Sequence, residues 1–149
     1  MQFTTTLLAA LTAATSVSAA PSIQARAVST TAQTPEWTIT AFKRACNGAD
    51  TSCTISFGID THLAPVTPCT YTVTGAPASH ATVGPVTCGA YTVTSSWSDF
   101  FGADKGFTTW SVSDWEKKLI AYPSYSDADL VNGVLVSPDR SFAVQAISW

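Results

Sequence analysis

The sequence is poor in basic residues, and this scarcity excludes one class of partner. Lys and Arg together number 7 against 10 Asp and Glu, which gives a formal net charge of −3. Basic residues are adjacent only at Lys43 and Arg44 and at Lys117 and Lys118. A nucleic-acid binder normally carries a basic stripe or patch. We therefore expect no nucleic-acid partner.

Long apolar runs are also missing after the first residues. The N-terminus passes from a polar start through an apolar stretch between Leu7 and Ala14 and ends in small residues. This pattern is typical of a secretory signal peptide and is too short for a membrane span. We predict cleavage after Ala19, since cleavage after Ala20 would place Pro21 beside the cut. The mature protein is expected to be secreted and extracellular, without a membrane span.

Three segments follow from this interpretation. Residues 1–19 are the predicted signal peptide, and residues 20–34, a loose run of Ser, Thr, Ala and Gln, are a predicted disordered leader. Residues 35–149 are enough for one modest hydrophobic core and are predicted to form a single domain. We expect a monomer or a weak dimer.

Motifs that would indicate catalysis or metal binding are absent from the sequence. It contains no G-x-S-x-G elbow, no calcium-binding D-x-[DN]-x-[DN]-G loop and no N-x-[ST] glycosylation site. The two histidines, His62 and His80, lie in loop-like surroundings, although Asp60 would share a strand face with His62. We predict a protein that is not an enzyme and has no cofactor and no metal.

Two catalytic alternatives stay open at this point. One is a small hydrolase that uses the pair Asp60 and His62. The other is a glycosidase-type pair of carboxylates, whose separation the sequence does not reveal. Its candidates are Asp99, Asp104, Asp114, Glu116, Asp127, Asp129 and Asp139.

Cysteines are few but even in number. Four cysteines in a small exported chain imply two disulfides, for which three pairings are possible. We favour Cys46 with Cys53 and Cys69 with Cys88, because each pair brackets turn residues between strand-like runs. Such bridges contribute about 2 to 3 kcal/mol each. Zinc is disfavoured because the spacing is not C-x2-C, and a redox pair because C-x6-C is not C-x-x-C.

What the mature region does contain is repeated alternation of apolar with Thr or Ser residues. Strands of this half-buried kind are indicated in "EWTITAFKRA", "CTISFGID", "CTYTVTG", "AYTVTS" and "TTWSVSD". The first of them would place Trp37, Ile39 and Ala41 on one face. Turn signals recur every eight to twelve residues or so, which predicts an all-β fold, a small antiparallel barrel or sandwich of about seven to eight strands.

Two smaller elements complete the expected fold. The segment "SYSDADLVNG" predicts one short helical turn, with Ser126 as its N-cap and Gly133 as its C-terminal stop. Residues 134–136 could form a last strand.

Aromatic residues are the remaining candidates for function. The stretch "SSWSDFFGADKGF" suggests a contact loop, with Trp97, Asp99, Phe100, Phe101 and Lys105 as its residues. The alternative is that these rings plug the end of the barrel.

Other tryptophans are expected in the core by their alternation. These are Trp37, Trp110 and Trp115.

Several long stretches, taken together, resemble a known family. They include "PEWTITAFKRACNGADTSCTISFGIDTH", "PCTYTVTG", "VTCGAYTVTSSWS" and "VNGVLVSPDRSFAVQ", and they hold all four cysteines. The chain is similar here to the fungal small secreted proteins that induce a hypersensitive response in plants. The resemblance implies a compact disulfide-bonded β-barrel akin to the Alternaria major-allergen type. It also implies an elicitor of plant defence, and it brings no catalytic residues.

The sequence thus leads to three functional hypotheses. The first is a secreted, non-enzymatic elicitor or effector whose partner is a plant surface receptor or a cell-wall component. The second is a cell-wall carbohydrate-binding module, and the third is a small secreted hydrolase.

Overall fold

A computed structural model describes residues 35–149. These residues form one antiparallel sheet that runs in the order β3-β2-β1-β9-β7-β6-β5-β4, with β8 paired to β6 off this path. The strands are β1 (Glu36–Cys46), β2 (Ser52–Asp60), β3 (Thr67–Thr74), β4 (Val83–Cys88), β5 (Tyr91–Ser98), β6 (Phe107–Asp114), β7 (Leu119–Ala121), β8 (Ser124–Ser126) and β9 (Arg140–Ala146). The predicted signal peptide and leader lie outside the described residues.

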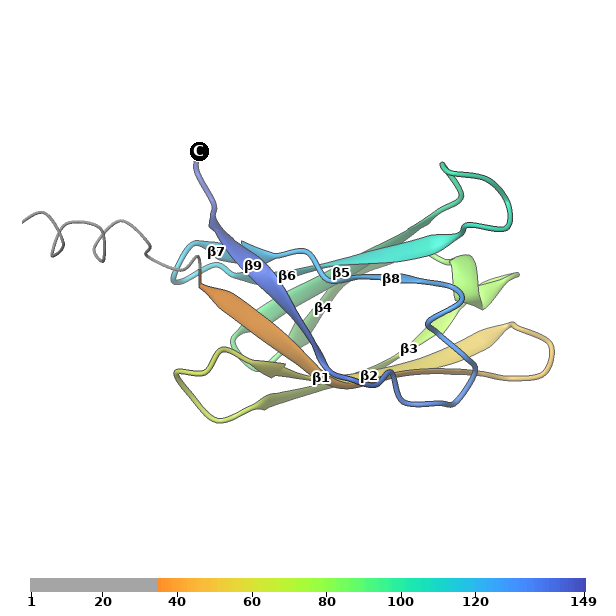
Figure 1. Cartoon of the computed structure of the whole chain (residues 1–149), viewed down its shortest axis with the longest axis horizontal. Coiled ribbons are helices and arrows are strands. Elements are labelled where there is room, and N and C mark those ends of the chain that lie inside the picture. Colours follow the sequence, from red (N-terminus) through yellow and green to blue (C-terminus); the bar gives the residue numbers. More distant parts are fainter. Residues whose placement is uncertain (1–34) are drawn as a thin grey trace, which may run out of the picture. The chain divides into compact units, whose positions relative to one another are not determined.

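The sheet curls into a nearly closed barrel, which confirms the predicted all-β fold (Figure 1). Successive strands pair as hairpins from β1 to β3 and from β4 to β7. β8 pairs with β6, and β9 crosses to lie between β1 and β7. The connections consequently gather at two ends. One end holds the β1–β2, β3–β4 and β5–β6 connections, and the other holds the β2–β3, β4–β5 and β6–β7 connections (Figure 1).

The strand interiors follow the alternation expected from the sequence. On β2, the four residues Cys53, Ile55, Phe57 and Ile59 are all buried. The inward positions of β5 and β6 are also buried, and Val93 and Val112 have no solvent-accessible surface. Burial of such side chains contributes about 1.5 to 3 kcal/mol each. The outward positions are mostly Thr and Ser, which suit a solvated β surface.

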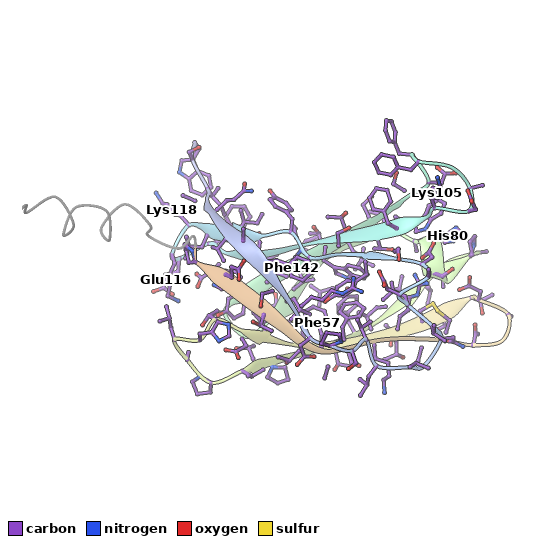
Figure 2. All side chains as sticks on the ribbon, viewed as in Figure 1. Phe57, His80, Lys105, Glu116, Lys118 and Phe142 are labelled. Atoms are coloured by element: carbon purple, nitrogen blue, oxygen red, sulfur yellow. A yellow bond between two sulfur atoms is a disulfide. The ribbon has the colours of Figure 1, made fainter. Side chains whose placement is uncertain are left out.

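Aromatic rings fill the centre of the barrel around Phe42. Its ring stacks on Tyr125 at a centroid distance of 4.6 Å and meets Trp110 edge-on at 4.8 Å. Phe57 and Phe142 continue this core (Figure 2). Trp110 Nε1 donates a hydrogen bond of 2.8 Å to the Tyr71 hydroxyl, so the one polar atom of the indole is paired.

The second half of β1 does not have the expected orientation, because a bulge interrupts the strand at Ala41. Ala41 is exposed at φ 49° and its N–H donates to Asp139 Oδ1, and the pairing with β2 shifts between Thr40 and Lys43. Because the extra residue reverses the alternation, Phe42 and Arg44 point inward in place of Ala41.

The expected helical turn is found elsewhere in the chain. One turn of 3-10 helix, η1 (Ala78–His80), lies between β3 and β4, whereas residues 127–129 and 132–133 form turns. The Ser126 hydroxyl does accept from the Asp129 N–H, as a cap would. Residues 134–136 contribute a single bridge between Leu135 and Lys43 in place of a strand.

Trp37 and Trp110 are buried as predicted, but Trp115 is 51% exposed. Trp115 follows the end of β6 at Asp114 and is five residues from the inward Trp110, so a period of two also places it on the outer face.

Both predicted disulfides are confirmed, and they have different structural roles. Cys46 and Cys53 are directly opposite each other in the β1–β2 ladder, so their bridge reinforces strands that already pair. The bridge between Cys69 and Cys88 joins β3 to β4, the two edges of the sheet. It therefore closes the barrel where the hydrogen-bonded path ends.

Candidate functional site

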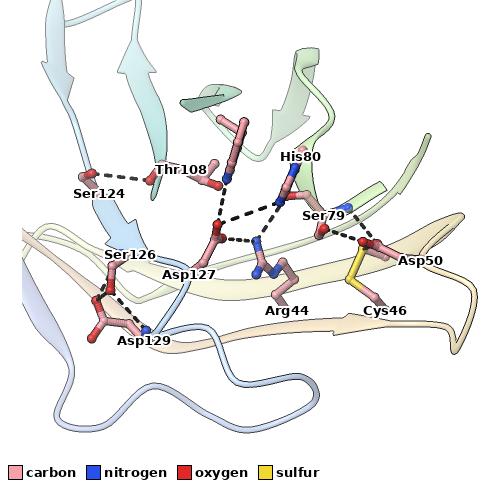
Figure 3. Close-up of polar contacts among 12 residues, drawn as sticks. Arg44, Cys46, Asp50, Ser79, His80, Thr108, Ser124, Ser126, Asp127 and Asp129 are labelled. Atoms are coloured by element: carbon pink, nitrogen blue, oxygen red, sulfur yellow. Dashed lines mark hydrogen bonds and ion pairs between the residues drawn. A yellow bond between two sulfur atoms is a disulfide. The ribbon is translucent and has the colours of Figure 1, made fainter. Parts of the chain in front are cut away.

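The end of the barrel that holds the β5–β6 connection carries a network of polar side chains (Figure 3). Its centre is Arg44, which the β1 bulge turns inward and which is 8% exposed. Arg44 Nη1 donates to Asp127 Oδ1 at 3.1 Å and to the Ser79 carbonyl at 3.2 Å. A buried guanidinium thus has a charged partner and a neutral one, as burial of a charge requires.

Asp50 extends this network into the β1–β2 turn. Its carboxylate accepts hydrogen bonds from the Ser79 hydroxyl and from the Ser79 N–H, and its carbonyl accepts from the Ala78 N–H at 2.7 Å. Burial pushes the pKa of Asp50 upward, but the hydrogen bonds from Ser79 outweigh it and leave this pKa below its ordinary value. Asp50 therefore holds η1 against the β1–β2 turn.

Trp97 and His80 join the network to the end of β5. The two rings stack at 3.7 Å with 6° between their planes, and Trp97 Nε1 donates to Asp127 Oδ2 at 2.8 Å. Gly106 packs directly against Trp97 and Asp127, since a Cβ at this position would collide with Asp127 Oδ2 and lie 2.9 Å from Trp97 Cζ2. Trp97, one of the predicted contact residues, is therefore half-buried and anchors the base of the loop.

The loop of residues 99–106, which we call the aromatic loop, projects from this anchored base (Figure 1). Phe100 is 83% and Phe101 67% exposed, and their rings meet edge-on at 5.2 Å. Backbone hydrogen bonds from Gly102 to Asp99 and from Lys105 to Gly102 define the turns of the loop. Asp99 and Lys105 are exposed on the same loop.

The sequence left two interpretations of these rings open, and the structure divides the residues between them. Trp97 packs into the network and Phe107 is half-buried, whereas Phe100 and Phe101 face solvent. Apolar rings that are this exposed on a fixed loop are suited to contact with another molecule.

The pair Asp60 and His62 does come together, at the opposite end of the barrel. His62 Nδ1 lies 3.5 Å from Asp60 Oδ2, and His62 Nε2 lies 2.9 Å from Thr38 Oγ1. The Thr38 hydroxyl also lies 2.8 Å from Ser141 Oγ. The order of groups is that of a nucleophile, base and carboxylate. The same contacts also fasten the β2–β3 loop to β1 and β9.

One group of possible metal ligands occurs within residues 35–149. It consists of Cys46, Asp50 and Cys53, whose ligand atoms lie within 4.8 Å of one another. A thiolate is the species that binds a metal, and both sulfurs here are in a disulfide. These residues therefore do not fit a metal ion. Within the same range, no helix is long and apolar enough to cross a bilayer.

A second polar cluster lies where the chain enters β9. Arg140 makes two hydrogen bonds to Asp129, of 2.7 and 3.1 Å, and lies over the Tyr125 ring at 5.0 Å. The hydrogen bonds from Arg140, helped by those from Ser126, hold the pKa of Asp129 well below its ordinary value. Burial raises the pKa of Tyr125.

The depressed pKa of Asp129 predicts a loss of stability in acid. Because its pKa is lower in the folded state, its contribution is complete above the unfolded-state value near 4 and is lost as the pH falls toward the folded-state value. We expect the free energy of unfolding to decrease below about pH 4. Asp129→Asn and Arg140→Gln should both flatten this decrease, as measured by urea unfolding at a series of pH values. An unchanged pH profile in both variants would contradict the assignment.

Known proteins resemble this chain over most of its length. The profile of a family described as Effector TSP1 matches residues 38–148. The chain belongs to the Effector TSP1 family. A protein named Effector TSP1 from Hypocrea virens (strain Gv29-8 / FGSC 10586) is 54% identical over 144 residues, which are 96% of this chain and 97% of that protein. The expected kinship with fungal effectors and elicitors is thereby confirmed, and the barrel described above is that of an Effector TSP1 family member.

The sequence did not reveal the residues that anchor the aromatic loop. Arg44 and Asp127 are 83 positions apart, and His80 appeared as an ordinary loop histidine. One signal was present, namely the charged residue Arg44 next to the apolar positions of the first strand. It became interpretable only once the bulge at Ala41 was known.

Proposed function

We propose that this Effector TSP1 family member is secreted and induces plant defence, including a hypersensitive response, by contact alone. The partner is a plant surface receptor or a cell-wall component, and the barrel acts as a monomer or weak dimer that catalyses no reaction. Two disulfides support an oxidising, extracellular location. The signal peptide predicted at residues 1–19 agrees with it.

The observation that carries this proposal is the exposed pair Phe100 and Phe101 on a loop with a fixed base. Interface hot spots are typically aromatic side chains that become buried on binding. A loop held in place loses less conformational entropy on binding than a mobile one. The stack of Trp97 on His80 and the bond of Trp97 to Asp127 provide that preorganisation.

Leaf infiltration with purified protein tests the proposal. The double variant Phe100→Ala/Phe101→Ala should need about a tenfold higher dose for the same defence response, because loss of two aromatic anchors costs more than about 1 kcal/mol in contact energy. Circular dichroism and thermal unfolding should match those of the wild type, since both rings face solvent.

The matched control is His62→Ala, which removes the histidine at the opposite end of the barrel. We expect it to retain the full response. A lost response with this variant would favour the hydrolase hypothesis, and an unchanged dose response in the Phe variant would exclude the aromatic loop as the contact surface.

A further inference from the structure

The two disulfides differ in how far solvent reaches them. Cys46 is half-buried, whereas Cys53, Cys69 and Cys88 are only 1%, 2% and 5% exposed. The bridge at the base of the β1–β2 turn therefore has one cysteine open to solvent, and the bridge at the seam has none. Thiol–disulfide exchange requires a thiolate to reach one of the two sulfurs. An external thiol is thus expected to react at Cys46 and not at the seam.

The bridge between Cys46 and Cys53 is also the one that the fold stabilises less. A fold and a disulfide stabilise each other by equal amounts, because both effects belong to one thermodynamic cycle. The cysteines of this bridge are separated by 7 positions, against 19 for Cys69 and Cys88. From loop-closure entropy alone, the bridge over the shorter loop is about fourfold easier to reduce in the folded protein.

Hydrogen bonds hold the β1–β2 turn in place independently of the bridge. The Asn132 side chain accepts from the Cys46 N–H at 2.6 Å and donates to the Cys46 carbonyl at 3.1 Å. Within the turn, the Asn47 side chain accepts from the Thr51 N–H at 2.8 Å. The other side of β2 pairs with β3 along its whole length. The ends of β1 and β2 are therefore fixed whether this bridge is oxidised or reduced, and the seam bridge still closes the barrel.

The bridge touches the polar network through one oxygen atom (Figure 3). Cys53 Sγ lies 3.5 Å from Asp50 Oδ1, which accepts from the Ser79 N–H at 2.9 Å. A sulfur in a disulfide carries no proton, whereas a thiol is a weak hydrogen-bond donor. A reduced Cys53 can therefore donate to the oxygen that holds η1, so the redox state of the bridge is registered in the network.

We propose that the bridge between Cys46 and Cys53 is a site of thiol–disulfide exchange, which an external dithiol reduces while the barrel stays folded. A thiolate of the dithiol attacks Cys46 Sγ, the S–S bond breaks, and its electron pair passes to Cys53 Sγ, which takes up a proton. The second thiol of the dithiol then attacks the mixed disulfide, releases Cys46 as a thiol and leaves the reductant as a disulfide. The bridge is the substrate of this exchange and not a catalytic C-x-x-C centre.

The test is limited reduction of the purified, folded protein, with dithiothreitol in one arm and reduced thioredoxin in the other. New thiols are alkylated with N-ethylmaleimide and located by mass spectrometry, since chymotryptic cleavage after Phe57 separates Cys46 and Cys53 from the seam cysteines. We expect labelling of Cys46 and Cys53 to be about tenfold faster than that of Cys69 and Cys88. Reduction in both arms identifies a protein dithiol as a partner, and reduction by dithiothreitol alone restricts the partner to small dithiols.

The structure of the reduced form is followed by circular dichroism and by amide NMR signals. The circular dichroism should not change, and Cys46→Ala/Cys53→Ala should give the same spectrum. The Ser79 amide signal should move on reduction, whereas that of Ile59, at the far end of β2, should stay in place. An unmoved Ser79 signal would overturn the contact of the reduced thiol with Asp50.

Two results would overturn the exchange site itself. One is equally fast labelling of all four cysteines, and the other is unfolding of the barrel as soon as the first bridge is reduced. The proposal does not depend on the proposed function, because every measurement is made without a plant. None of these outcomes bears on the leaf assay.

Discussion

Replacing Cys69 and Cys88 with Ala should destabilise the barrel by about 3 kcal/mol, because the bridge closes a loop of 19 residues in the unfolded chain. The native state should loosen as well, since this bridge joins the two edge strands β3 and β4. Both cysteines are buried, at 2% and 5% exposure, so removal of their sulfurs also weakens packing at the seam. Thermal unfolding should shift downward by about 10 °C or more.

The control is the double variant Cys46→Ala/Cys53→Ala. Its bridge closes a loop of only 7 residues and joins strands that already share a ladder, so its loss should cost less, about 2 kcal/mol. Amide exchange should separate the two variants. Faster exchange along β3 and β4 is expected only when the seam bridge is missing. Equal costs and equal exchange in both variants would refute the view that this bridge closes the barrel.

Asp127→Ala should cost about 3 kcal/mol, because it leaves the buried guanidinium of Arg44 without its charged partner. The Trp97 N–H loses its acceptor at the same time. This value is at the low end for a broken buried pair because the Asp127 side chain is 31% exposed. Urea unfolding followed by tryptophan fluorescence measures the change.

A double-mutant cycle isolates the interaction between the two charges. Arg44→Met alone leaves a carboxylate that still reaches water, so we expect it to cost less than Asp127→Ala. The double variant Arg44→Met/Asp127→Ala should be more stable than the sum of the single effects predicts, since no buried charge is left unpaired. Simple additivity would show that the pair does not support the loop base.

Five strands of the barrel, β1, β2, β3, β5 and β6, were predictable because each one carries its own signal. The segments of β4, β7, β8 and β9 carry no such clear alternation and were not identified. Alternation of apolar and hydroxyl residues along β2 or β5 reflects the period of two of any half-buried strand, whatever its neighbours are. The disulfide pairing was also accessible, because each pair lies across a short connection and forms locally. The bulge was not accessible. The Ala41 N–H bonds to Asp139, 98 positions away, and no local signal marks an alanine for positive φ.

The candidate site, like the fold, was predictable from the sequence only in part. Its aromatic loop was visible in the sequence as Phe100 and Phe101 among turn residues, but the exposure of these rings and the burial of Trp97 depend on packing. The expectation that Trp115 is buried was wrong, because Trp115 is an odd number of residues from the inward Trp110 and lies past the end of β6 at Asp114. Asp114 itself is buried and accepts hydrogen bonds from Lys117, which closes the turn there.

By itself, then, the sequence determined the all-β class, the two disulfides and the kinship with fungal effectors, since these depend on local periodicity, short-range pairing and overall similarity. The tertiary structure alone decided where Arg44 points and how Asp127 fixes the aromatic loop. The physical reason is that inward and outward positions reverse at a bulge, and the polar network needs side chains from several segments. Both depend on contacts between segments far apart in the chain, which no local pattern encodes.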